Sequence, residues 1–264
     1  MCDERERENQ QRLKMAAAVS CDLRDQAAVI LAAKDSLQRV IGEYMQDPGQ
    51  QKAAAALQYI EQSVHRLERI NMNLQDISRC AAGQLIPAWQ PVCLSEACRQ
   101  LCEQAALFAQ GQNLRCRLPK KAVIVPSDPY FFDRILLNLL TNAMQACPEG
   151  NITVTLKSDA GWVLVAVDDQ GPGLPPQRLA APFEPVYRSQ TSCGQLGLYV
   201  SHLLAEQLGG SLQAENLPAG GARLVLRLPV RDELGQQAFF APDAMQEQYR
   251  QKRMRAEFSV LVQG

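Results

Sequence analysis

The chain has 264 residues, 47% of them hydrophobic, which is enough for a sizeable core in one or two domains. Its formal net charge of -1 and its pI of about 6.2 give no bulk attraction for nucleic acid or for an anionic membrane surface. The charged start MCDERERENQQRLK does not fit a signal peptide, and no apolar run approaches the roughly 18 residues of a membrane span. We therefore expect a cytoplasmic protein without a membrane segment and without a nucleic-acid partner.

The first 82 residues carry a coiled-coil pattern that is interrupted once. Apolar and small residues recur at alternating three- and four-residue steps at Leu13, Ala16, Ser20, Leu23, Ala27, Ile30, Lys34, Leu37, Ile41 and Tyr44. After the breaker QDPGQ (46–50), the pattern returns at Leu57, Ile60, Val64, Leu67, Asn71, Leu74 and Ser78. We predict an antiparallel helical hairpin over residues 1–82. One hairpin has too small a core, so two should pair into a dimeric four-helix bundle.

In residues 83–230, segments with a helical pattern of apolar residues alternate with segments that have the pattern of strands, so the predicted fold class is α+β. The expected elements, in chain order, are a short strand within GQLIPAWQPVC, a helix over 94–110, strands in LRCRL and AVIVP, a helix over 128–146, a hairpin around Asp-Ala-Gly, a helix over GLYVSHLLAEQLGG and a closing hairpin. Asp128 is the expected N-cap of the helix over 128–146, with Pro129 at its first position. Residues 231–264 form a C-terminal extension to which the pattern gives no role.

Cysteine usage points away from covalent or metal cross-links. The chain has nine cysteines and no Cys-x-x-Cys pair, which argues against a disulfide framework and against a zinc site. Cys98 and Cys102 share a helical face without a nearby histidine, so we interpret them as small residues of a core.

Two motifs in the mixed domain have the composition of a nucleotide site. Asn138 and Asn142 lie four residues apart, so both amides project from one helical face. In DDQGPGL (168–174), Asp169 ends an apolar strand, where a buried carboxylate is costly unless a group such as an exocyclic amine donates to it. Gly197, near the expected start of the next helix, offers amides and the positive end of a helix dipole to phosphate. Alone, the asparagine pair is weak evidence, because two asparagines on a helix are usually just solvated, and the glycine motif also fits a tight turn.

Four ordered blocks together resemble one family. Asn-Leu-Leu-Thr-Asn-Ala, Asp-x-Gly-x-Gly, Phe-Glu-Pro and Leu-Gly-Leu are similar to the N, G1, F and G2 boxes of sensor histidine kinases, whose ATP-binding domain is shared with gyrase, the Hsp90 chaperones and the mismatch-repair ATPases. The segment NAMQACPEGNITV resembles most the sequences of the nitrogen-regulation branch of these kinases. The resemblance covers about residues 10–230, and it implies a dimerisation and phosphoacceptor hairpin followed by an ATP-binding α/β sandwich.

The resemblance implies specific roles for the matching residues. Asp169 would accept a hydrogen bond from the adenine amino group, and Gly171 and Gly173 would make room for the ring. Asn142 would coordinate Mg²⁺ between the phosphates of ATP. Asn138 stands where the hydrolysing relatives have a general-base glutamate and the kinases a polar helper. Gly197 and Leu198 would begin the helix beneath the phosphates. A homodimer that signals to a response regulator or another signalling protein is the implied assembly.

The sequence departs from the family at the phosphoacceptor. The family carries a His-Asp/Glu-Leu-Arg-x-Pro-Leu box, and CDLRDQA aligns with it without a gap, so Cys21 occupies the histidine position and Gln26 the proline position. Residue 21 lies one step from the seam position Ser20, on the flank where an acceptor faces solvent. The other histidines do not fit: His65 is expected opposite residue 33, about 18 Å along the bundle from Cys21, and His202 is expected to pack within its helix.

The loop that covers the phosphates departs as well. In the nitrogen-regulation branch, Phe-Glu-Pro is typically followed by a lysine and then by Gly-Thr-Gly-Leu-Gly-Leu, whereas here Gln190 replaces the lysine, and Cys193 and Gln195 replace two glycines. Loss of a cation near the γ-phosphate weakens the stabilisation of transition-state charge.

These observations favour a pseudokinase: a histidine kinase homologue that binds ATP and cannot phosphorylate itself at the usual position. Three alternatives remain open at this stage. One is an active kinase or ATPase that acts on a partner's histidine, the second is a nucleotide-free interaction scaffold, and the third is a redox role for Cys21 beside Arg24. No sensor domain precedes the hairpin in this sequence, so, unless the chain is a fragment, the signal is expected to arrive through a partner or through the hairpin itself.

Overall fold

The structure is a computed structural model, and it confirms a mixed helix and sheet protein with helices at the N-terminal end. It describes residues 23, 27–39, 41, 49–109, 111–184, 193–230, 254 and 257–258, without side chains for 49–52 and 193–195. The chain forms two compact units, residues 1–85 with 255–264, and residues 86–254. Across the described ranges, no helix has both the length and the apolarity that a bilayer span requires.

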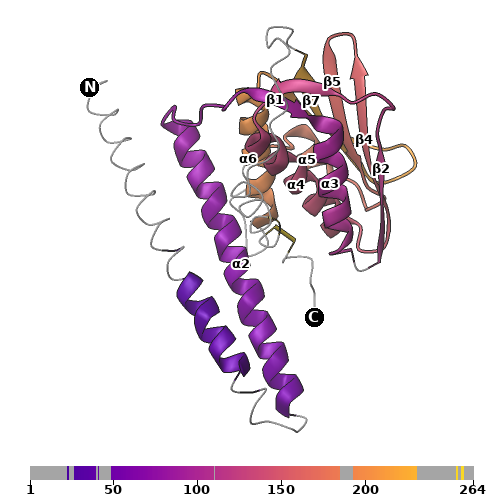
Figure 1. Cartoon of the computed structure of the whole chain (residues 1–264). Coiled ribbons are helices and arrows are strands. Elements are labelled where there is room, and N and C mark those ends of the chain that lie inside the picture. Colours follow the sequence, from indigo (N-terminus) through magenta and orange to yellow (C-terminus); the bar gives the residue numbers. More distant parts are fainter. Residues whose placement is uncertain are drawn as a thin grey trace. The chain divides into compact units, whose positions relative to one another are not determined.

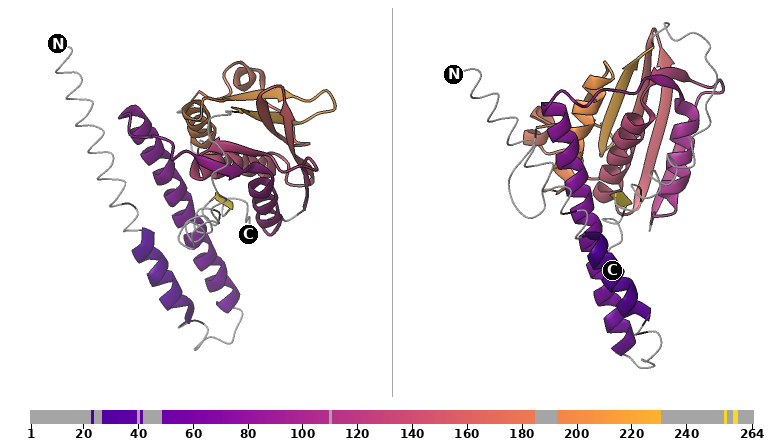
Figure 2. Two further views of the ribbon diagram at one scale, coloured as in Figure 1. Left: turned by 45° about the horizontal axis from the view of Figure 1, so that its top comes forward. Right: turned by 60° about the vertical axis from the view of Figure 1, so that its left-hand side comes forward.

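The first unit contains two antiparallel helices. Residues 27–39 are helical, and α2 (Gly49–Ala81) runs back alongside them (Figure 1, Figure 2). Lys34 Nζ lies 3.1 Å from Glu61 Oε2, so the two helices are joined by an ion pair between positions 34 and 61. Helix α2 begins inside the predicted breaker QDPGQ, because Gly49 already belongs to its first turn.

The Lys34–Glu61 pair corrects the prediction of which residue of the first helix lies opposite His65. Since position 34 lies opposite 61 in an antiparallel pair, position 65 lies opposite about position 30, not 33. Cys21, from which a separation of about 18 Å was predicted, lies outside the described residues. His65 itself lies between two acids of its own helix, with Nδ1 3.0 Å from Glu68 Oε2 and Nε2 3.9 Å from Glu61 Oε1.

The coiled-coil positions divide into a buried and an exposed set. The buried set comprises every second position: Ala27 and Lys34 on the first helix, and Leu57, Val64 and Asn71 on α2. Six other described positions form what we call the exposed heptad stripe, each between 39% and 52% exposed: Leu23, Ile30, Leu37, Ile60, Leu67 and Leu74. Ile41 and Ser78 are half-buried. The hairpin therefore buries half of its seam internally and leaves a continuous apolar stripe, at seven-residue spacing, on its surface.

The second unit is built on a five-stranded mixed sheet in the order β2-β4-β5-β7-β6. Its strands are β2 (Gln112–Arg117), β4 (Gly150–Asp159), β5 (Trp162–Asp168), β6 (Ser211–Asn216) and β7 (Ala222–Pro229). A separate two-stranded antiparallel sheet pairs β1 (Gln90–Cys93) with β3 (Ile124–Ser127). The helices are α3 (Leu94–Ala106), α4 (Pro129–Ala146), the short α5 (Pro176–Ala180) and α6 (Cys193–Gln207).

One face of the large sheet holds the core. Alternate residues of the central strands are buried, among them Ile152, Val154, Val163, Val165 and Leu226, and helices α3, α4 and α6 cover this face (Figure 1). The alternation follows from the two-residue period of a strand, which turns every second side chain toward the helices. Strand β2 joins the sheet parallel to β4, a pairing that its own sequence does not predict.

Local chemistry at two turns confirms the predicted elements. Asp128 caps α4, because its Oδ1 accepts a hydrogen bond of 3.1 Å from the amide of Phe131, and Pro129 is the first helical residue. Between β4 and β5, Ala160 and Gly161 have φ values of 41° and 85°, as a tight hairpin with two left-handed residues requires.

Candidate functional site

Two adjacent aspartates end strand β5, and the structure gives them opposite environments. Asp168 forms a bidentate ion pair with Arg223, the residue opposite it on β7, with distances of 2.7 and 2.8 Å. Asp169 is 6% exposed and has no basic partner among the described residues. Asp168 is therefore committed to holding β5 and β7 together, while Asp169 is the carboxylate available for another role.

Backbone amides hold one oxygen of Asp169. Oδ1 accepts a bond of 2.8 Å from the amide of Gly171 and one of 3.2 Å from the amide of Ala222, at the start of β7. No described residue donates to Oδ2. The side chain is thus oriented from both sides, with one carboxylate oxygen left for a donor from outside the described protein.

Burial raises the pKa of the Asp169 carboxyl above its ordinary value. The two amide bonds lower this pKa and the neighbouring charge of Asp168 raises it, but desolvation is the largest cause. A hydrogen bond from an additional donor would offset the free-energy cost of burying the charged carboxylate, because it would stabilise the charged form.

The raised pKa predicts that stability depends on pH through Asp169. Because the folded-state pKa lies above the unfolded value of about 3.9, the folded protein binds this proton more tightly than the unfolded chain does. The free energy of unfolding should therefore fall as the pH rises from about 4 through the raised pKa. Asp169→Asn removes this contribution. Urea unfolding at about pH 4 and about pH 7 should show the variant gaining stability relative to wild type at the higher pH. An unchanged difference would contradict the assignment.

The glycines around Asp169 are needed by the protein's own backbone. A Cβ at Gly171 would lie 2.5 Å from the carbonyl oxygen of Ala146, at the end of α4. Gly173 has φ +77°, and a Cβ there would meet Asn216 Oδ1 at 3.0 Å. Both glycines were predicted to make room for a flat ligand, and the structure adds a packing reason for each: they let the loop after β5 approach its neighbours.

Gly221 is required in the same way, and it gives a stability prediction. It has φ +90°, and a Cβ would lie 2.0 Å from the carbonyl oxygen of Asp169. Gly221→Ala should destabilise the protein by about 3 kcal/mol or more, since left-handed strain and overpacking add. Gly220→Ala is the matched control, because Gly220 has φ +93° and open space where the Cβ would be. It should lose only about 1–2 kcal/mol in denaturant unfolding. Equal losses in the two variants would show that the contact with Asp169 is not tight.

The two asparagines of α4 differ in how far the protein uses them. Asn138 is fully buried, and its Nδ2 donates to the carbonyl oxygen of Gly197 and to Ser201 Oγ, both at 3.0 Å. It therefore braces α4 against α6. Asn142 lies one turn later and is half-buried, and its buried Nδ2 has no hydrogen-bond partner among the described residues. Each asparagine of the predicted pair thus has one amide atom without a partner among the described residues: Oδ1 of Asn138, which is an acceptor, and Nδ2 of Asn142, which is a donor.

Helix α6 begins earlier than the sequence pattern predicts. It starts at Cys193, so the amides of its first turn, which lack intrahelical partners, precede Gly197. Gly197 instead presents its carbonyl oxygen to Asn138, and the side chain of Leu198 is buried in the core. A phosphate held at this helix terminus would bind the earlier amides.

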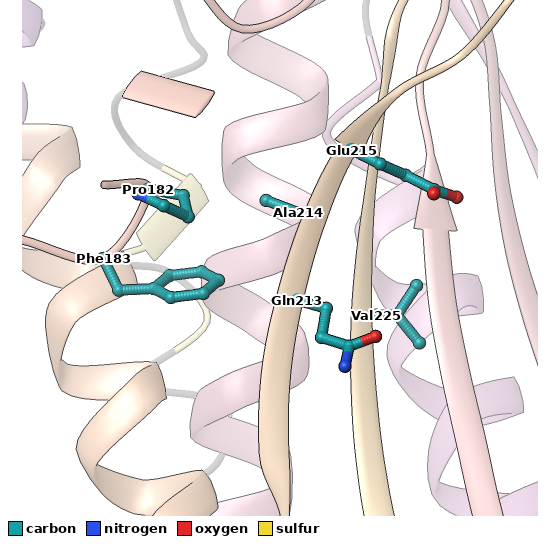
Figure 3. Close-up of a pocket in the computed structure, with 6 residues that line it drawn as sticks. All are labelled: Pro182, Phe183, Gln213, Ala214, Glu215 and Val225. Carbon is teal, nitrogen blue, oxygen red and sulfur yellow. The ribbon is translucent and has the colours of Figure 1, made fainter. Parts of the chain in front are cut away.

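Phe183 joins the segment after α5 to α6. Its ring stacks on His202 with centroids 5.2 Å apart, which confirms that His202 packs within the domain. Figure 3 shows Phe183 pointing toward β6, where it lines a pocket of about 370 Å³ with Pro182, Gln213, Ala214, Glu215 and Val225. Neither Asp169 nor Asn142 lines this pocket, so it is distinct from the predicted site.

Sequence reasoning missed the residues that position Asp169. Ala222 supplies an amide to its carboxylate, and Asn216 clamps the loop by accepting from the amide of Leu174 and donating to its carbonyl oxygen, at 2.7 and 2.9 Å. Both residues lie in the stretch ENLPAGGA, from which the sequence predicts only a hairpin turn. Its paired glycines are nevertheless the signal that could have found them, because a glycine lets another backbone segment, here that of Asp169, come close.

Some predicted features lie outside the described residues. These are Cys21 with most of its box, and Gln190, which precedes α6 in the sequence. Cys193 and Gln195 are helical, but their side chains are not described. Across the described ranges, no group of three histidine, cysteine, aspartate or glutamate side chains could hold a metal ion.

Comparisons with known proteins agree on the type of domain. Residues 127–232 match the family model of histidine kinase-, DNA gyrase B- and HSP90-like ATPases. The chain is 33% identical over 217 residues to the sensor histidine kinase ZraS of Klebsiella oxytoca, covering 80% of this chain and 40% of ZraS. It is 29% identical over 235 residues to the sensor protein KdpD of Mycobacterium tuberculosis, covering 86% of this chain and 27% of KdpD. The chain thus spans less than half the length of these curated relatives.

Solved structures share the fold. Full-length ShkA in complex with AMPPNP superposes with a TM-score of 0.66 at 22% identity, covering 82% of this chain and 46% of ShkA. The histidine kinase ThkA in complex with the response regulator protein TrrA gives a TM-score of 0.58 at 20% identity, covering 88% of this chain and 66% of ThkA.

Proposed function

The chain belongs, through residues 127–232, to the histidine kinase-like ATPases, and from this membership we propose that it binds ATP with Asp169 as the adenine-reading residue. The observation that carries the proposal is the carboxylate itself, which is buried, is held through Oδ1 by two amides, and leaves Oδ2 without a described donor. The adenine amino group is a donor of the required kind, and its hydrogen bond would offset the desolvation of the carboxylate.

The phosphate end would be served by α4 and α6. Asn142 would hold Mg²⁺ through its side-chain oxygen, a ligand type that this ion prefers. Its Nδ2, which has no partner among the described residues, is a donor and would be left to bond an oxygen of the nucleotide. Bound ATP with Mg²⁺ supplies a transferable γ-phosphoryl group. Asn138 would act indirectly, because it fixes α6 against α4 below the helix terminus. Gly197 and Leu198 would support that terminus through backbone and core contacts.

We further propose that the protein does not autophosphorylate. A thiol at position 21 replaces the imidazole that would accept the phosphoryl group, and Gln190 replaces a cation expected near the γ-phosphate. The protein would then signal through nucleotide-dependent docking to a response regulator or another signalling protein. The complex of ThkA with TrrA supports a partner of that class.

Incubation with ATP radiolabelled at the γ-phosphate tests this proposal. We expect no acid-labile phosphate on a histidine of the wild-type chain. We expect Cys21→His to gain label only when it is combined with Gln190→Lys, because the double variant restores both the acceptor and the cation, beside the retained Asp22, Leu23 and Arg24. Cys21→Ser is the matched control and should stay unlabelled at histidine. Acid-labile label on the wild type would overturn the proposal.

A homodimer through the first unit is the proposed assembly. The exposed heptad stripe supports it, because six apolar residues at seven-residue spacing on both helices match the seam of a four-helix bundle. A second copy of the hairpin would present the same stripe, as a two-fold interface requires.

A further inference from the structure

Three free thiols converge between α3 and β2 in the second unit. Cys98 and Cys102 lie one turn apart on α3, and both are buried on the face of this helix that belongs to the core. Cys116 lies on β2, in register with Val154 of β4, whose side chain is fully buried under the helices. The two-residue period of a strand therefore turns Cys116 toward α3, which packs against β2 (Figure 1).

Two of these thiols are in direct contact. The side chains of Cys102 and Cys116 are hydrogen-bonded to each other, so the contact joins the helical layer to an edge strand of the large sheet. Among the described residues, no group of three potential ligands could hold a metal ion, so the contact is not part of a metal site. Two thiols at hydrogen-bond distance are instead the arrangement from which a disulfide can form.

The two thiols differ in exposure and in acidity. Cys102 is buried, whereas Cys116 is half-buried on the edge strand. The hydrogen bond from Cys102 lowers the pKa of the Cys116 thiol, desolvation and the charge of Glu103 raise it, the charge of Arg99 lowers it, and the net shift is downward. The same hydrogen bond, and then burial, raises the pKa of the Cys102 thiol. Cys116 thus ionises first and is the more exposed of the two.

We propose that Cys116 and Cys102 form a dithiol that a hydroperoxide oxidises to a disulfide, with Cys116 as the attacking thiol and Cys102 as the resolving thiol. The contact between the two side chains carries this assignment, since a resolving thiol must reach the sulfur that has been oxidised. The disulfide would join α3 to β2. This reactivity goes beyond the proposed nucleotide binding and does not depend on it.

The oxidation balances in two steps. The Cys116 thiolate attacks the terminal oxygen of the hydroperoxide, the O–O bond breaks, and the leaving alkoxide or hydroxide takes up the proton that the thiol had lost. Cys116 is then a sulfenic acid, oxidised by two electrons. Cys102 next attacks the sulfur of Cys116, the S–O bond breaks, and the hydroxyl group leaves as water with the proton of Cys102. Two thiols and one hydroperoxide give one disulfide, one alcohol or water, and one further water.

Peptide mapping of the full chain after treatment with hydrogen peroxide tests the proposal. The protein is reduced with dithiothreitol, separated from the reductant, oxidised, and alkylated at its remaining thiols before digestion. Trypsin places Cys98, Cys102 and Cys116 in the separate peptides 80–99, 100–115 and 116–117. We expect to recover 100–115 joined to 116–117, and we expect dithiothreitol to separate them.

Variants distinguish the attacking from the resolving thiol. In Cys102→Ala the sulfenic acid of Cys116 should persist, so dimedone should label peptide 116–117 at least about tenfold more than in the wild type. In Cys116→Ala, peptide 100–115 should carry neither the disulfide nor the label. Cys98→Ala is the matched control, because it removes a buried thiol from the same face of α3. It should keep the wild-type yield of the disulfide.

Two results would overturn the proposal. One is a native wild-type chain in which 100–115 and 116–117 stay unlinked, or in which peptide 80–99 is linked in their place; this result needs no variant. The other is a Cys102→Ala chain with wild-type circular dichroism that takes up no dimedone on peptide 116–117, which would exclude Cys116 as the attacking thiol. These measurements are made without nucleotide, so they stand or fall separately from ATP binding.

Discussion

Asp169→Ala is expected to weaken the binding of Mg-ATP by about 100-fold, because a hydrogen bond to a charged group contributes about 1.5–3 kcal/mol and the carboxylate also shapes the loop after β5. The loop depends on it through the amide of Gly171, which donates to Oδ1 at 2.8 Å. Isothermal titration calorimetry measures the change directly. Asp169→Asn should lose most of the same affinity, since an amide lacks the charge that strengthens the bond.

Asp168→Asn is the matched control for this prediction. It changes an adjacent aspartate whose partner is Arg223, at the half-exposed edge of β5 and β7. Its cost should be a stability loss of about 1 kcal/mol or less, as for other solvent-accessible ion pairs. Nucleotide affinity should stay within about threefold of wild type, since the side chain of Asp168 is paired with Arg223 and acts on Asp169 through its charge alone. Equal loss of affinity in the two variants would show that Asp169 has no special place in the site.

Leu67→Glu combined with Leu74→Glu is expected to convert a dimer into monomers. Both residues belong to the exposed heptad stripe, at 46% and 44% exposure, so the change costs little within one hairpin. In the dimer it would place four carboxylates in an apolar seam, where unpaired charge is strongly unfavourable. Light scattering after size exclusion should give about twice 29.2 kDa for the wild type and 29.2 kDa for the variant.

Tyr59→Glu controls for surface charge on the same helix. Tyr59 is 63% exposed and lies off the stripe, so the variant should remain a dimer. A wild-type chain that runs as a monomer at micromolar concentration, or a double variant that stays dimeric, would exclude the stripe as the interface.

The sequence predicted the elements with local signals well. Asp128 and Pro129 predict the start of α4, and Asp159 to Gly161 predict the turn between β4 and β5. Both predictions succeed because helix capping and left-handed turns depend on residues that are close together in the chain. It also favoured Asp169 over Asp168 as the ligand-facing acid. That choice stays a prediction; in the structure Asp168 is paired with Arg223, and no described side chain pairs with Asp169.

Features that depend on distant residues were not predictable. The support of Asp169 by Ala222 spans 53 residues, and that of Leu174 by Asn216 spans 42, so no local pattern reports them. The division of the coiled-coil seam into buried and exposed halves needed the Lys34–Glu61 register. The ion pair between Arg69 on α2 and Glu257 joins residues almost 190 positions apart, which is why the extension looked featureless.

Titration of the wild-type chain with Mg-ATP and, separately, with Mg-GTP tests the central claim most directly. Asp169 offers only an acceptor, so it should bind the amino group that adenine carries and disfavour the carbonyl oxygen that guanine presents at the corresponding position. We predict a binding isotherm for Mg-ATP and at least about tenfold weaker binding of Mg-GTP, with the ATP signal lost in Asp169→Ala. No heat with Mg-ATP, or equal affinity for the two nucleotides, would contradict the proposal that Asp169 reads adenine.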